Sequence, residues 1–371
     1  MCNDQSGPPV NHGPVIVADE ITDDNASERL TSIASSTHSL SSSILQHRHE
    51  NGRTYHKYKA GRYNYPNDER EMDRLDFQHE LFLLTLHDRL GLAPPNEPGS
   101  KVNRVLDLGT GTGIWAIDFA DEHPEAVVGN PEGSQVPRKL KLEPGIWRGS
   151  FAYTNDRVRT NTPWGTLFFG MLISSSSVPP NIRFEVDDIE ETWTYREPFD
   201  YIHCRAMTSS ISDWRKLLQQ AYDHLQPGGW FELQEGHVRP LSDDGTLTRE
   251  HSLSRWADYI EEACNIMGRP FVNVLSLVEI MREIGYVNVT YSTFKWPLNT
   301  WPKDEHYQTL GHFNHENYME GIEGFTLAPF SRALKWSREA VDMFLVGNDW
   351  QMVFDTPKTL ALLEEGSNSK Q

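Results

Sequence analysis

Leu106-Asp107-Leu108-Gly109-Thr110-Gly111-Thr112-Gly113 is the stretch of this 371-residue chain that decides its fold. It begins in an apolar run of strand length, and residues 114–120 continue from it with the composition of a helix start. A strand, a glycine-rich turn and a helix in this order form the first unit of a parallel α/β sheet, and such a turn binds a nucleotide-like ligand. The stretch therefore predicts an α/β fold with a ligand at the turn.

The spacing of the glycines and the acid before them distinguish between two kinds of ligand. A dinucleotide fingerprint would place its third glycine at position 114, where the sequence has Ile114. The carboxylate of Asp107 would repel a pyrophosphate, whereas S-adenosylmethionine (SAM) has no phosphate and ends in an ammonium group. We therefore predict SAM as the cofactor, the alternative being an ordinary glycine-rich turn. The predicted binding residues of the turn are Asp107, Gly109, Thr110, Gly111 and Gly113.

Three more apolar runs of strand length follow the turn. They cover residues 182–186, 199–204 and 230–233, and a helical pattern at residues 214–225 precedes the last of them. Strands that alternate with helices predict a parallel sheet with helices on both faces. We therefore expect a doubly wound, Rossmann-like α/β sheet.

A second group of candidate residues follows the strand predicted at residues 182–186. Asp187 and Asp188 come at the carboxyl edge of the sheet, where open α/β folds bind their ligands. There Asp188 would accept a hydrogen bond from an adenine amino group, and Ile189 would pack on the ring. The alternative, an acidic loop in solvent or a cap for the next helix, fits the spacing equally well.

The next strand ends in polar side chains at the same edge. Cys204 completes the predicted cofactor-binding set, although a small apolar residue is equally typical of a core. His203 would be either a general base or a hydrogen-bonded core histidine, and Arg205 a clamp for a substrate carboxylate. Glu235 and His237 follow the next strand and would line the same edge, but polar loop residues are the stronger interpretation of both. The core interpretation of His203 is the stronger one, so we assign no catalytic residue.

The charge balance limits the kinds of partner. With 34 basic and 53 acidic residues the net charge is -19, so nucleic acid and an anionic membrane would both repel the chain. The three cysteines are too widely spaced for a metal pair or a disulfide framework, and we predict no metal site. We find neither a secretory signal nor the roughly 20 apolar residues of a membrane span. We therefore expect a protein of the cytoplasm, the nucleus or both that binds neither nucleic acid nor a membrane.

The N-terminal part divides into an arm and a helical region. Residues 1–50 are rich in Ser, Thr, Asp and Asn and poor in large apolar side chains, which predicts a disordered arm. Residues 67–70 then match a helix start, a cap residue followed by acids, and leucines at mostly helical spacing follow. We therefore predict a helix here, which Gly91 and Pro94-Pro95 would end.

The chain resembles the fungal LaeA-like methyltransferases, also described as velvet-complex-associated or TAM-domain methyltransferases. Residues 51–346 would form the methyltransferase domain, including its cap. The similar stretches are residues 105–120, 184–195, 199–214 and 225–236 of the sheet region, residues 50–56 and 75–92 of the cap, Lys295-Trp296-Pro297, and Gly321-Ile322-Glu323-Gly324-Phe325.

The resemblance implies a class I SAM-dependent methyltransferase fold. Asp107, Gly109 and Gly111 would then face the methionine end of SAM, and Asp188 with Ile189 the adenine. The resemblance also implies a link to fungal secondary metabolism, through a regulatory role or through methylation of a metabolite. No catalytic residue is carried over from the family.

Two segments depart from the family pattern. Residues 130–177 form a basic insertion where the family has a short turn, and Glu132 stands one residue late for the acid that binds the ribose. Residues 347–371 form an atypical tail in place of an aromatic-rich final strand, which we expect to be missing. Both segments begin at Gly-Asn, which GGTAAY can encode, and GTAA is a common intron start. We hypothesise that each is unspliced intron read in frame, the alternative being a genuine insertion.

Three functions are compatible with this sequence. The first is an enzyme that transfers the SAM methyl group by in-line attack to a small molecule or a protein side chain, with orientation supplying most of the acceleration. The second is an interaction module that regulates secondary metabolism through protein partners and needs little turnover. The third is an inactive variant, in which the ribose acid and the last strand are compromised.

Overall fold

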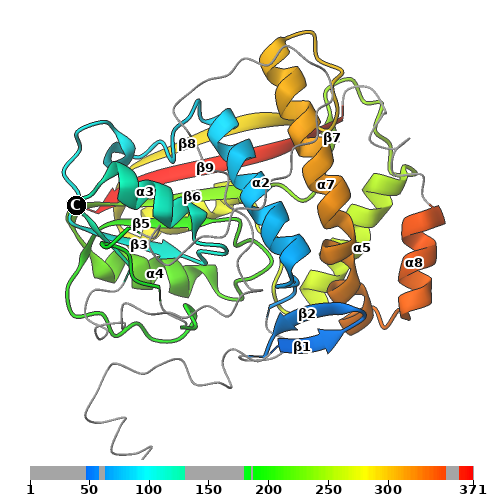
Figure 1. Cartoon of the computed structure of the whole chain (residues 1–371), viewed down its shortest axis with the longest axis horizontal. Coiled ribbons are helices and arrows are strands. Elements are labelled where there is room, and N and C mark those ends of the chain that lie inside the picture. The colour runs from blue at the N-terminus through cyan, green and yellow to red at the C-terminus, as the bar shows by residue number, and fades with distance from the viewer. Residues whose placement is uncertain (1–46, 58–62, 130–178, 185–186, 348–358, 371) are drawn as a thin grey trace, which may run out of the picture.

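The computed structural model describes residues 47–57, 63–129, 179–184, 187–347 and 359–370. Within these ranges a seven-stranded sheet has the order β4-β3-β5-β6-β9-β7, and β8 pairs with the free side of β9 (Figure 1). The parallel strands are β3 (Arg104–Leu108), β4 (Val127–Val128), β5 (Phe199–Arg205) and β6 (Leu225–Gly236). The expected doubly wound α/β fold is confirmed for this half of the sheet.

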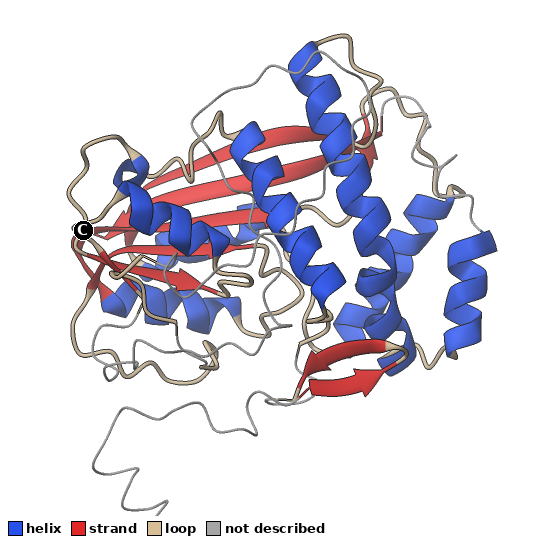
Figure 2. Cartoon of the chain, viewed as in Figure 1, coloured by secondary structure: helices blue, strands red, loops and turns tan. Residues whose placement is uncertain are grey.

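The antiparallel half of the sheet corrects one expectation. It consists of β7 (Leu241–Ser242), β8 (Tyr286–Pro297) and β9 (Thr359–Lys370). Because β9 pairs with both β6 and β8, the final strand that the sequence predicted to be missing is present (Figure 2). A strand ladder is made by backbone groups, and β6 needs a partner for its own N–H and C=O groups. The strand therefore forms here without the aromatic pattern of the family.

Alternate residues of the parallel strands face two helical layers, as a period of two requires. Val105 of β3 packs with Trp115 and Phe119 on one face, and Leu106 packs with Leu217 on the other. The helices of these layers are α3 (Ile114–Glu122) on the first face, and α4 (Trp214–His224) and α6 (Val274–Ile284) on the second. The predicted helices around the sheet are thus confirmed.

A helical cap lies beside the sheet, with α2 next to α7 (Figure 1). Its elements are the hairpin β1 (His47–Glu50) and β2 (Arg53–His56), α2 (Glu69–Thr85), α5 (Ser252–Ile266), α7 (Glu305–Arg332) and α8 (Arg338–Gly347); the short helix η1 (Pro94–Asn96) leads from the cap to β3. Asp68 caps α2 by accepting a hydrogen bond from the backbone N–H of Glu71, so the predicted helix start is confirmed.

Two further expectations need correction at their boundaries. The sequence predicted a disordered arm over residues 1–50. His47–Glu50 instead form β1, because their backbone pairs with β2. Residues 1–46 lie outside the described residues. The strand predicted at residues 182–186 is reduced to one parallel bridge between Ile182 and Val128, and residues 185–186 are not described. The insertion at residues 130–177 also lies outside the described residues. Within the described part, no helix is long and apolar enough to span a membrane.

Candidate functional site

The turn between β3 and α3 adopts a backbone conformation that requires its glycines. The φ angle is +69° at Gly109, +58° at Gly111 and +84° at Gly113. These angles are left-handed, a region that costs other residues energy. A Cβ at Gly113 would also lie 2.8 Å from the ring of Phe184. Gly109 and Gly111 are exposed, so the turn offers bare backbone to a ligand.

Thr110 and Thr112 of the turn have different surroundings. The Thr110 hydroxyl oxygen is buried and has no hydrogen-bond partner among the described residues. Thr112 is buried, and its side chain hydrogen-bonds to Asp76 of α2. The turn therefore combines a polar atom that a ligand can satisfy with a direct contact to the cap.

Asp107 lies beside this turn and is already hydrogen-bonded. It is the register partner of His203 on β5, whose Nδ1–H donates to Asp107 Oδ1 over 2.7 Å. The His203 ring is fully buried and stacks on Trp115 with 3.7 Å between ring centroids. This arrangement matches the interpretation of His203 as a core histidine. Asp107 therefore holds β5 against β3 directly below the turn.

Cys204 is placed next to the turn by its backbone, while its side chain faces away from it. Cys204 pairs in register with Leu108, the last residue of β3. Its thiol is fully buried in the apolar cluster that contains Leu217 and Leu218 of α4. Burial raises the pKa of this thiol well above its ordinary value. The side chain thus belongs to the core, and any contact with a cofactor falls to the backbone of Cys204.

Asp187 and Asp188 form a tight acidic loop. The Asp187 carboxylate accepts a hydrogen bond from the N–H of Asp188 over 2.8 Å, and Asp188 accepts one from the N–H of Glu190 over 3.0 Å. Ile189 packs against the cluster under α4. These contacts fit the alternative interpretation of the sequence, an acidic loop. Phe184, which precedes this loop in the sequence, lies against Gly113 of the glycine turn. The contact of Asp188 and Ile189 with adenine stays a prediction.

Glu190 anchors this loop to the neighbouring elements. Its carboxylate accepts hydrogen bonds from the N–H of Ser212 over 2.7 Å and from Arg269 over 2.6 Å. Although burial raises the pKa of Glu190, these hydrogen bonds hold it below its ordinary value. A pocket of about 440 Å³ opens here, and Lys216 and Met267 also line it. The acidic loop is thus fixed to the start of α4 and to the end of α5.

The loop after β5 is strained and is held by a buried acid. Ala206 and Ser209 have φ angles of +53° and +60°, which are rare outside glycine. Glu235 accepts hydrogen bonds from the N–H groups of Met207, over 2.8 Å, and Thr208, over 3.0 Å. Sequence reasoning interpreted Glu235 as a polar loop residue. This interpretation was wrong, because Glu235 is 1% exposed and β6 brings it under the strained loop.

The cap helix α2 reaches the carboxyl edge of the sheet through His79. Its Nε2–H donates to Asp118 of α3 over 2.8 Å, and its Nδ1 accepts from Arg205 of β5 over 3.1 Å. Burial is the largest cause that lowers the pKa of His79, so a neutral ring fits both contacts. Burial also lowers the pKa of Arg205 to about 10. Arg205, predicted as a substrate clamp, is thus partnered by the cap.

Sequence reasoning missed Asp76 and His79. Both are buried polar residues on α2, three positions apart, so they share one face of the helix. Their spacing, with Leu83 four positions after His79 on the same stripe, was the available signal. Both side chains contact the glycine turn or the helix that follows it.

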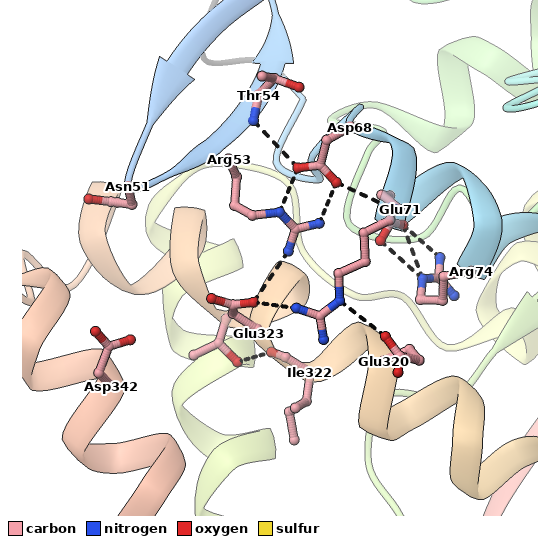
Figure 3. Close-up of polar contacts among 12 residues, drawn as sticks. Asn51, Arg53, Thr54, Asp68, Glu71, Arg74, Glu320, Ile322, Glu323 and Asp342 are labelled. Atoms are coloured by element: carbon pink, nitrogen blue, oxygen red, sulfur yellow. Dashed lines mark hydrogen bonds and ion pairs between the residues drawn. The ribbon is translucent and has the colours of Figure 1, made fainter. Parts of the chain in front are cut away.

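Ion pairs tie the parts of the cap together (Figure 3). Arg53 of β2 forms two hydrogen bonds to the Asp68 carboxylate, over 2.5 and 2.7 Å, and lies 3.6 Å from Glu323 of α7. Arg70 of α2 also bonds to Glu323, over 2.7 Å. Arg53 and Glu323 belong to two of the motifs on which the resemblance rested, at residues 50–56 and 321–325. The structure therefore brings these distant motifs into one contact.

Comparisons with known proteins agree with this arrangement. The family model described as "Methyltransferase domain" matches residues 77–291. The chain is 38% identical over 330 residues to methyltransferase pytC of Aspergillus terreus, covering 86% of this chain and 89% of the relative. It is 34% identical to the secondary metabolism regulator LAE1 of Cochliobolus heterostrophus, with coverage of 78% and 84%. It is 32% identical to the secondary metabolism regulator laeA of Aspergillus niger, with coverage of 79% and 68%.

The matched family model covers more than half of the chain, from α2 to β8. It includes the glycine turn, the acidic loop and the strained loop after β5. The relatives extend the similarity over most of the remaining residues. The chain therefore belongs to the methyltransferase domain family and, within it, to the LaeA-like fungal SAM-dependent methyltransferases.

Proposed function

We propose that this methyltransferase transfers the methyl group of SAM to a small natural product or to a protein side chain in fungal secondary metabolism. The glycine turn carries the proposal, because its exposed left-handed glycines let a ligand approach the backbone and its spacing does not match a pyrophosphate site. The similarity to pytC, LAE1 and laeA supports the link to secondary metabolism.

The residues around the turn fit a cationic nucleoside without phosphates. Gly109 and Gly111 offer bare backbone, and Thr110 offers an unpartnered hydroxyl among the described residues. The carboxylates of Asp107 and Asp76 flank the turn with negative charge that suits the methionine end of SAM. Asp188 and Ile189 remain the proposed adenine contacts. When bound, SAM supplies a methyl group that its sulfonium activates for transfer.

The chain's own residues position the reactants. Orienting an acceptor in line with the methyl group supplies most of the acceleration, so a strong base is not required. His203 is not assigned as that base, because its ring, including the unpartnered Nε2, is fully buried against Trp115. The loop that Glu235 holds and the helix α2 that His79 anchors border the carboxyl edge of the sheet.

A second function is regulation of secondary metabolism through protein partners. The similarity to LAE1 and laeA, which are regulators by name, favours this alternative. In that case the methyltransferase domain would serve as an interaction module and need little turnover. The two functions differ in whether a methyl group leaves SAM.

Transfer of a tritiated methyl group from SAM to a fungal extract tests the proposal. We expect label from the wild-type chain in the organic-soluble fraction for a small molecule, or in the acid-precipitated fraction for a protein. Gly109→Ala is the control variant, because a Cβ at φ +69° strains the turn and would overlap the Met207 thioether. Binding of S-adenosylhomocysteine without label in either fraction would favour the regulatory function. Absence of any adenosyl binding would contradict the transferase function.

A further inference from the structure

Asp76 is a buried acid of α2 that lies against the glycine turn. The side chain of Thr112 hydrogen-bonds to it, and the neighbouring Leu75 lies 3.5 Å from a Cβ built on Gly111. Asp76 is 7% exposed, and its Oδ1 is buried without a hydrogen-bond partner among the described residues. Its carboxylate thus reaches the turn with one oxygen unused.

Three acids raise the pKa of Asp76 through their charge. Asp73 and Glu80 lie on the same helix, and Asp118 lies on α3. Burial, followed by these neighbours, raises the pKa of Asp76 to about 6, against the opposing effect of the Thr112 hydrogen bond. An acid in such surroundings destabilises the fold when it is ionised. Arg205 is the nearby cation, but its charge is shared between Asp107 and Asp118 rather than paired with Asp76.

Other buried acids of this protein have their partners within the chain. Glu232 is 0% exposed and accepts hydrogen bonds from the N–H groups of Leu92, over 2.8 Å, and Ala93, over 3.0 Å, and from the Tyr201 hydroxyl over 2.8 Å. Glu235 likewise accepts two backbone hydrogen bonds, from Met207 and Thr208. Asp76 differs from both because one of its oxygens lacks a partner. A cationic ligand at the turn would supply one.

We propose that Asp76 binds the α-ammonium group of the methionine part of SAM, from the cap rather than from the sheet. The inference rests on the proposed function, since it assigns one end of the same cofactor. Asp107, the acid that the sequence predicted for this role, already accepts a hydrogen bond from His203. Asp76 is the flanking acid that has a buried oxygen without a partner among the described residues. The cap helix would then form part of the methionine end of the site.

Calorimetric titration of the full chain with two ligands tests this assignment. The first ligand is S-adenosylhomocysteine, and the second is 5′-deoxy-5′-(3-carboxypropylthio)adenosine, the same molecule without its α-amino group. A hydrogen bond to a charged group is worth about 1.5–3 kcal/mol, so Asp76→Asn should weaken S-adenosylhomocysteine binding about 10- to 100-fold. The amino-free ligand should bind the variant and the wild-type chain equally. Asp73→Asn, an exposed acid one turn away, should change neither affinity.

The possible outcomes separate this inference from the proposed function. Equal loss of affinity for both ligands in Asp76→Asn would overturn the inference, because the residue would then only shape the site. An unchanged affinity for S-adenosylhomocysteine would overturn it too, while leaving the proposed function intact. A wild-type chain that binds neither ligand would overturn both. The melting temperature of the ligand-free variant supplies a readout of folding, and it should exceed that of the wild-type chain above pH 6.

Discussion

Asp107 and Asp76 flank the same glycine turn, but Asp107 is paired with an imidazole and Asp76 only with the Thr112 hydroxyl. Asp107 accepts a hydrogen bond from His203, and that imidazole stacks on Trp115. Asp76 has one oxygen without a partner among the described residues and three acids around it. Asp107 joins two strands and supports the fold. Asp76 destabilises the fold when it is ionised, which is the expected cost of a site that binds a cation.

Removal of the partner of Asp107 should have the largest effect. His203→Phe keeps a ring against Trp115 but leaves the buried Asp107 carboxylate without its donor. We expect a loss of about 3 kcal/mol in the free energy of unfolding, measured by urea denaturation. The double variant Asp107→Leu/His203→Phe should recover part of that loss. A loss below about 0.5 kcal/mol in the single variant would show that the hydrogen bond from His203 to Asp107 does not stabilise the fold.

Removal of the charge of Asp76 should have the opposite sign. Because the folded-state pKa of about 6 lies above the ordinary value of 3.8, this residue makes the fold less stable as the pH rises from 3.8 to 6. We expect Asp76→Asn to raise the free energy of unfolding by about 2 kcal/mol at pH 7.5 and to change it little at pH 3.5. Urea denaturation at both pH values measures this. A variant less stable than the wild-type chain at pH 7.5 would refute the comparison.

A smaller loss is expected at Glu235, a buried acid that accepts two backbone hydrogen bonds. Glu235→Gln keeps one acceptor oxygen and weakens the two charge-assisted hydrogen bonds to Met207 and Thr208. We expect a loss of about 1–2 kcal/mol in the free energy of unfolding. Because Met207 lies against Gly109, S-adenosylhomocysteine should also bind several-fold more weakly. An unchanged affinity would show that the strained loop is independent of the turn.

The smallest effect is expected at Asp73, which shares the helix of Asp76 but is exposed. Asp73→Asn should change the free energy of unfolding by less than about 0.5 kcal/mol. The pKa of Asp76 should fall slightly in this variant, because one acidic neighbour loses its charge. Titration of Asp76 by NMR would measure it. A rise in that pKa would contradict the electrostatic account.

The features that could be predicted from the sequence are local ones. Strand β3, the glycine turn and α3 are set by the φ angles that only glycine adopts easily and by apolar residues a few positions apart. The same holds for the start of α2 at Asp68. The pairing of Asp107 with His203 needed the register of two strands nearly one hundred residues apart, so the sequence left that role open.

The features that could not be predicted depend on contacts across the chain. Asp76 and His79 look like exposed positions of a helix until α3 and β5 cover them. Strand β9 was expected to be missing because its side chains differ from the family pattern, but backbone pairing with β6 and β8 decides its structure. The intron origin of residues 130–177 and 347–371 stays a hypothesis, which continuous coding reads across codons 130–177 in the mature transcript would refute.

Calorimetric competition at the glycine turn tests the central claim most directly. The wild-type chain is titrated with S-adenosylhomocysteine, alone and in the presence of saturating SAM or NAD. We predict that S-adenosylhomocysteine binds one site, that SAM suppresses its binding and that NAD leaves it unchanged, since the acids beside the turn repel a pyrophosphate. Suppression by NAD, or an absence of S-adenosylhomocysteine binding, would contradict the account.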